Sequence, residues 1–249
     1  MLTSAIFAFA LFLKQGEPVT GKSIIEKMLN RYASASSLDG TITLTQSAQG
    51  VSVVTQTAVA FEKPSKILVY QKQGGSNPRS SILVSNGDKF FFTRPEQVLS
   101  PNDYMGELVK PDARPGQTVG QLYAIAAAEL PDRSPALDIV IGRPEDLKYC
   151  MDQLKTFTYT GKTTVGDKSL HTIVGSWREN QVIGARVGNF EMYISDDGDL
   201  VRYVLRQNYS VSGDDGKPVG APIPVVSTWD AAVTVNTPVK PEKFALRVH

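Results

Sequence analysis

The chain has 249 residues, of which 26 are Lys or Arg and 25 are Asp or Glu, so its formal net charge is +1. This balance provides no field that would draw the chain onto nucleic acid. One cysteine, Cys150, and two histidines, His171 and His249, exclude an internal disulfide framework and leave almost no scope for a Cys/His zinc site. We therefore expect no metal, no cofactor and no nucleic-acid partner.

An uncharged apolar run occupies residues 2–13. Because about 20 apolar residues are needed to span a bilayer, the run is too short for a membrane helix and matches the core of a secretory signal. No Lys or Arg precedes it and no A-x-A site follows it, so an uncleaved anchor and a buried helix remain as alternatives. We predict an exported protein, periplasmic or secreted, with a signal-like segment at 1–16 and a single domain at 17–249.

The first third of the chain is predicted to be a helix followed by an antiparallel meander. Apolar residues recur at helical spacing over 22–35, and Thr20 is a suitable cap for that helix. The spacing then changes to the period of strands. Gln49-Gly50 and Asn86-Gly87 are turn signals between these strands, which we place at 41–45, 51–62, 66–72, 81–84 and 89–92.

The rest of the chain is predicted to be helical and then β again. Residues 119–130 are apolar almost all round, which is typical of a buried helix or one that covers an apolar surface. A further helix is predicted at 144–154, where we interpret Cys150 as a small core residue. Without alternating strands and helices a parallel sheet is excluded. The remaining strands are predicted at 156–162, 169–179, 188–195, 199–210 and 225–235.

No motif of catalytic chemistry is found in the sequence. It contains no nucleophile elbow, zinc-protease motif, phosphate loop or dinucleotide fingerprint. Residues 196–199 resemble part of a calcium loop but lack the distal Glu, so we interpret them as a turn. His171 is interpreted as a cross-strand residue, and no spacing selects a pair among the 25 acids. We therefore predict no catalytic residues and no enzyme.

Apolar residues occupy consecutive positions in the strands at 67–70 and 90–92. A sheet with one wet face would instead alternate apolar and polar residues. Two arrangements explain such runs. Either the sheet is covered on both faces, or it curls around an apolar cavity large enough for a small ligand.

Several segments resemble the periplasmic lipoprotein-carrier superfamily, that is, LolA/LolB-like proteins and the related outer-membrane lipoprotein-sorting proteins. The matching parts are the end of an amphipathic helix followed by a strand that runs to Gln46, an aromatic strand end with a basic residue and Pro before the next strand, an aromatic hairpin, and part of the tail. They are Leu29-Asn30-Arg31-Tyr32, Leu38-Asp39-Gly40, residues 58–69, residues 83–92 with Arg94-Pro95-Glu96, and Pro241-Glu242-Lys243-Phe244.

The resemblance implies a mainly β (α+β) fold, in which a large curved antiparallel sheet forms a half-open β-barrel wrapped around a few α-helices. It also implies an apolar cavity that holds acyl chains. The carriers have an arginine in the first long strand that gates the lid, whereas residues 43–46 contain none. A sorting-protein relative with its own ligand is therefore implied, rather than a carrier with the same hand-over mechanism.

We predict that the protein is a non-enzymatic carrier or binding protein for a lipid or lipoprotein acyl chain. It is expected to be monomeric, with envelope proteins as further partners. The alternative is a structural or protein-interaction module of the cell envelope with a filled core. The predicted cavity residues are those that share a strand face, together with residues of the middle helix: Ile42, Leu44, Val59, Phe61, Ile67, Val69, Phe90, Phe92, Leu122, Ile125 and Ala126.

Overall fold

The computed structural model describes residues 19–76, 78–92, 116–127, 130–143, 154–177, 188–212 and 218–245. The predicted signal-like segment and Cys150 lie outside these residues. Within them are three α-helices, ten strands and a short 3-10 helix. Their bounds are α1 Gly21–Ser34, β1 Ser37–Ala48, β2 Val51–Glu62, β3 Lys66–Gln73, β4 Arg79–Asn86, β5 Phe90–Phe92, α2 Val119–Ala126, α3 Pro135–Ile141, β6 Leu154–Val165, β7 Lys168–Trp177, β8 Asn189–Ile194, β9 Leu200–Ser212, β10 Pro218–Val235 and η2 Pro241–Phe244.

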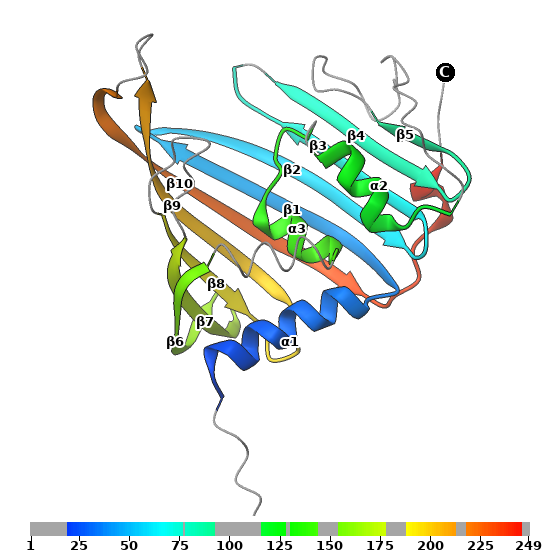
Figure 1. Cartoon of the computed structure of the whole chain (residues 1–249), viewed down its shortest axis with the longest axis horizontal. Coiled ribbons are helices and arrows are strands. Elements are labelled where there is room, and N and C mark those ends of the chain that lie inside the picture. Colours follow the sequence, from blue (N-terminus) through cyan, green and yellow to red (C-terminus); the bar gives the residue numbers. More distant parts are fainter. Residues whose placement is uncertain are drawn as a thin grey trace, which may run out of the picture.

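All ten strands belong to one antiparallel sheet in the order β5-β4-β3-β2-β1-β10-β9-β8-β7-β6. The first and last strands of the chain, β1 and β10, pair in the middle and join the two meanders. The sheet is strongly curved, and its edge strands β5 and β6 are not paired with each other (Figure 1). The predicted fold class is confirmed: a mainly β protein with a curved, unclosed antiparallel sheet and a few helices.

Helix α1 begins and packs as its sequence predicts. The Thr20 hydroxyl accepts a hydrogen bond from the Ser23 amide at 3.1 Å, which satisfies a free donor of the first turn. Tyr32 is fully buried, and its hydroxyl accepts a hydrogen bond from the Leu200 amide of β9 at 3.0 Å. Arg31 forms a two-point ion pair with Asp199, with Nε 2.5 Å from Oδ1. These contacts attach α1 to the start of β9.

The helices after β5 differ from the prediction. Helix α2 ends at Ala126, earlier than expected, and α3 was not predicted. Its apolar β-branched residues do not show helical spacing, but Ser134 caps it and Gly142 ends it in the left-handed conformation. The helix predicted at 144–154 lies outside the described residues except for Leu154. That residue begins β6, which corrects its assignment.

Both faces of the sheet are covered at the β5 end. Helices α2 and α3 lie over the concave face (Figure 1). On the opposite face, Phe244 of η2 and Val239 pack against Ala60, and a second cluster joins Ile82, Val84 and Phe91. The apolar run at 90–92 therefore corresponds to a strand buried on both faces.

In the described residues, no helix is long and apolar enough to cross a membrane.

Candidate functional site

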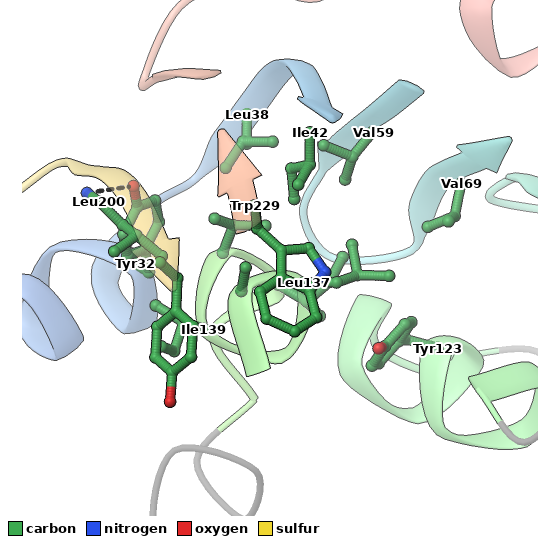
Figure 2. Close-up of a cluster of buried hydrophobic side chains, with 14 of the residues drawn as sticks. Tyr32, Leu38, Ile42, Val59, Val69, Tyr123, Leu137, Ile139, Leu200 and Trp229 are labelled. Atoms are coloured by element: carbon green, nitrogen blue, oxygen red, sulfur yellow. Dashed lines mark hydrogen bonds between the residues drawn. The ribbon is translucent and has the colours of Figure 1, made fainter. Parts of the chain in front are cut away.

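Ten of the eleven predicted cavity residues are brought together on the concave face. They belong to one buried cluster with residues of α1, α2 and α3. The strand register explains the grouping, because Val59 lies opposite Val69 and Phe61 lies opposite Ile67. Figure 2 shows Ile42, Val59 and Val69 pointing from the strands toward the two helices. Their role as the lining of a cavity stays a prediction.

Ile125 is the exception and corrects our expectation. Its residue is 36% exposed, whereas Leu122, Tyr123 and Ala126 of the same helix are buried. The buried stripe of α2 therefore runs through Tyr123 and leaves Ile125 on the outer side. Tyr123 lies on the buried side of α2, among the buried side chains drawn in Figure 2.

The concave face changes from apolar to polar along β2 and β3. In β2 the inward residues are Phe61 and Val59, followed by Thr57 and Thr55, all of them buried. The polar residues align across strands, because Thr57 lies opposite Gln71, and Gln71 lies opposite Ser81. An apolar floor is thus followed by a buried row of hydroxyl and amide groups.

A buried carboxylate joins this polar row to the segment between α2 and α3. The Gln71 side chain donates to the carbonyl of Asp132 at 2.7 Å and accepts from its amide at 3.0 Å. The Asp132 carboxylate accepts from the indole nitrogen of Trp229 in β10 at 3.1 Å. We call these three residues the Asp132 clasp. It fixes the α2–α3 segment to both halves of the sheet.

The clasp is electrostatically unusual because it lies in an apolar interior. Burial raises the pKa of the Asp132 carboxyl to about 6, despite hydrogen bonds from Trp229 and Ser134. A second buried acid, Asp138, accepts a hydrogen bond from the Tyr123 hydroxyl at 2.7 Å. Arg133 approaches Asp138 to 4.0 Å. Among the described residues, two acids therefore lie at this junction, and the guanidinium of Arg133 approaches one of them.

Ser81 is a polar residue of the row that lacks a partner. Its residue is 1% exposed, and among the described residues its hydroxyl finds no hydrogen-bond partner. A buried hydroxyl without a partner costs roughly 1–3 kcal/mol. A ligand with a polar group at this position would remove that cost.

His171 lies in a second polar cluster, on β6–β8. It pairs across strands with Lys162 and Ile194, as expected of a cross-strand residue. Its ring nitrogens lie 3.0 Å from the Tyr159 hydroxyl and 2.9 Å from the Asp196 carboxylate. A hydrogen bond from Lys162 lowers the pKa of the exposed Asp196 carboxyl. The cluster connects the β8–β9 turn to β6 and β7.

The turn at 196–199 also contacts α1. Asp199 is held by Arg31, and Lys27 donates to the carbonyl of Asp196 at 2.6 Å. Our interpretation of these residues as a turn is confirmed, with Gly198 at a positive φ of 88°. Among the described residues no group of three acidic, histidine or cysteine side chains is placed to hold a metal ion.

Sequence reasoning missed the polar row and the clasp. Gln71 follows Ile67 and Val69 at the strand period, so a polar residue on the core face was visible in the sequence. Thr55 and Thr57 precede Val59 in the same way. Asp132 lies in a loop and gave no comparable signal, because its partners Gln71 and Trp229 are 61 and 97 residues away.

No known sequence family matches the chain. No curated protein matches it either. Solved structures do match, at low identity. The Mycobacterium tuberculosis lipoprotein LppX is 10% identical to this chain, with a TM-score of 0.39. The match covers 88% of this chain and 96% of the LppX chain. A LolA superfamily protein from Nitrosomonas europaea is 10% identical, with a TM-score of 0.25. That match covers 92% of this chain and 99% of the Nitrosomonas protein.

The MucA/MucB complex of Pseudomonas aeruginosa also matches, with 11% identity and a TM-score of 0.41. The match covers 90% of this chain but only 60% of that one. The structures that match thus include a LolA superfamily protein. The geometry of the concave face is the basis for the functional argument.

Proposed function

We propose that the protein is an exported, non-enzymatic binding protein or carrier for the acyl chain of a lipid or lipoprotein. The chain would lie on the concave face, under α2 and α3. The observation that carries this proposal is the change of that face from apolar to polar along β2 and β3. An amphiphile matches this order, with its tail beside Val59 and Phe61 and its polar group beside Thr57 and Ser81.

The physical basis of binding would be burial of the chain. Each CH₂ group removed from water contributes about 0.8 kcal/mol, so a C16 chain binds without a charged clamp. The row next to the apolar floor consists of hydroxyl and amide groups, with the Asp132 carboxyl beyond them. Esters, hydroxyls and the protonated carboxyl of a fatty acid can all hydrogen-bond to this row, whereas the Asp132 carboxylate would repel an ionised carboxylate.

The helices are short compared with the strands that they cover. Helix α2 has eight residues, or roughly 12 Å, whereas the twelve residues of β2 span roughly 40 Å. A modest outward movement of α2 and α3 would therefore make room for a chain along β2. Such a movement requires the Asp132 clasp to open or to tilt.

The first test is whether the purified protein contains lipid. The full chain is exported in a bacterial host, purified without detergent, and extracted for lipid mass spectrometry. We expect a co-purifying lipid near one per protein, and displacement of that lipid by a fluorescent C16 fatty acid. If neither lipid nor fatty-acid binding is found, the proposal is wrong.

Ser81→Ala provides a sharper test. Removing a buried hydroxyl without a partner should leave the protein as stable as before or more stable, while fatty-acid affinity falls about two- to tenfold with the lost hydrogen bond. Ser80→Ala is the matched control, because Ser80 is also buried but points to the other face. A filled core would give no difference in affinity between the two variants.

The alternative function is a protein-interaction module with a filled core. The Asp132 clasp favours it, since the hydrogen bonds to Gln71 and Trp229 hold the helical segment against the sheet. This alternative predicts no lipid in the purified protein. It also predicts that fatty acid leaves the unfolding temperature unchanged.

A further inference from the structure

Two stretches of chain without charged residues meet at one end of the sheet. Residues 40–61 and 218–229 contain no Asp, Glu, Lys or Arg. The strand register brings the two stretches together, because Ala48 pairs with both Val51 and Val225. In Figure 1 this end lies at the upper left, where the β1–β2 turn meets β9 and β10.

Strand β10 extends beyond the rest of this end. Its pairing with β1 stops at Val225, whereas its pairing with β9 continues to Pro218. Residues 219–224 therefore form a two-stranded arm with β9 that reaches roughly 20 Å past β1. We define the uncharged end as residues 49–54 of the β1–β2 turn together with residues 219–224 of this arm.

Large apolar side chains are exposed on the uncharged end. Val51 is 66% exposed, Val54 is 41% exposed and Val219 is 59% exposed. These are three of the five large hydrophobic residues that are exposed in the described part of the chain, the others being Val19 and Ile125. Exposed apolar residues distributed along one end of the sheet are typical of a surface that is covered in use.

Two cations of the described part of the chain flank the uncharged end. Lys72 pairs in register with Gln56 of β2, and Arg79 pairs with Gln73 of β3. Both are exposed, and neither forms an ion pair within the part of the chain that the structure describes. A second copy docked through the same surface about a twofold axis would bring these like charges toward each other. An anionic surface would instead attract them.

We propose that the uncharged end docks on the surface of a lipid bilayer that contains anionic lipids. Val51, Val54 and Val219 enter the interface, and Lys72 and Arg79 face the head groups. The inward residues of β2 then run from the bilayer surface, through Thr55 and Thr57, to the apolar floor. The docking surface itself does not depend on whether a chain is bound there.

The experiment is vesicle flotation with the full exported chain. Vesicles of phosphatidylcholine are compared with vesicles of equal parts phosphatidylcholine and phosphatidylglycerol, for the unmodified protein and three variants. All proteins share the same N-terminus, so residues 1–18 contribute equally. We expect the unmodified protein to bind the anionic vesicles, and V51D/V54D to bind them at least tenfold more weakly.

Two further variants show whether an effect comes from added charge anywhere on the protein or from the uncharged end and its flanking cations. T158D/T164D adds the same two charges at exposed positions of β6 and should bind within about twofold of the unmodified protein. K72E/R79E should lose the preference for phosphatidylglycerol. Circular dichroism and thermal unfolding check that each variant is folded, which we expect because the substituted residues are exposed.

Failure of this proposal is distinguishable from failure of lipid binding. V51D/V54D should still bind fluorescent fatty acid in solution, where no membrane is needed. Docking is refuted if the unmodified protein binds neither vesicle, or if V51D/V54D binds as well as T158D/T164D. A concentration-dependent dimer that V51D/V54D abolishes, without vesicle binding, would identify a second copy as the occupant and would also refute it.

Discussion

The Asp132 carboxyl shows how a single residue can set the pH response of this protein. Its ordinary pKa is 3.8, and burial raises it to about 6 in the folded state. Between these values the folded protein binds the proton more readily than the unfolded chain does. The stabilising contribution of the protonated acid is therefore present below pH 4 and is lost as the pH rises toward 6.

We predict that Asp132→Asn raises the free energy of unfolding at pH 7. The pKa difference of about two corresponds to an ionisation cost of ~3 kcal/mol at most, and an amide can still accept the Trp229 hydrogen bond. Urea unfolding between pH 4 and 7.5 measures the effect. The unmodified protein should lose stability from pH 4 to 6, and the variant should show a flatter profile. Identical profiles would mean that Asp132 does not titrate in this range.

Among the elements, α3 depends on one close approach to α1. Gly142 ends α3 with φ 69°, and a Cβ atom on it would lie 2.5 Å from the carbonyl oxygen of Tyr32. Only glycine fits there without moving a backbone. This contact sets how deeply α3 lies on the concave face.

Gly142→Ala should therefore destabilise the protein by more than its backbone conformation alone would cost. Gly166 is the matched control, with φ 63° and no atom within 4 Å of the point that a Cβ would occupy. We expect Gly166→Ala to lose ~1 kcal/mol and Gly142→Ala clearly more, in urea unfolding at constant pH. Equal losses would show that α3 moves away from α1 at little cost.

How much of the structure was predictable also differs between elements. All ten strands were located, because alternating residues and turn glycines such as Gly50 and Gly87 are local signals. Helix α3 was missed because its burial is tertiary, with six of its seven residues buried against other parts of the molecule. The strand period was sufficient to place the predicted strand residues in one buried cluster, while their role as a cavity lining stays a prediction. Ile125 was misplaced because the sequence of one short helix does not define its buried side.

For the whole molecule, the pairing of β1 with β10 is the decisive long-range contact. It joins Leu38 to Val235, so the sheet stays in two parts until the end of the chain is available. We predict that a chain ending at residue 217 shows no cooperative urea transition and is rapidly cleaved by protease. A cooperative transition in that shortened chain would show that the meanders fold independently.

Full-length refolding should be slow, on the scale of milliseconds to seconds.

The position of Trp229 gives the protein an optical probe of its own. Its indole donates to Asp132 and lies beside Tyr203 in the concave face, and the chain has only two tryptophans. Replacing the other, Trp177, by phenylalanine would leave one emitter at the place where clasp, core and expected ligand meet. Its emission wavelength would then follow the ionisation of Asp132 and the arrival of an acyl chain in the same sample, without any attached label.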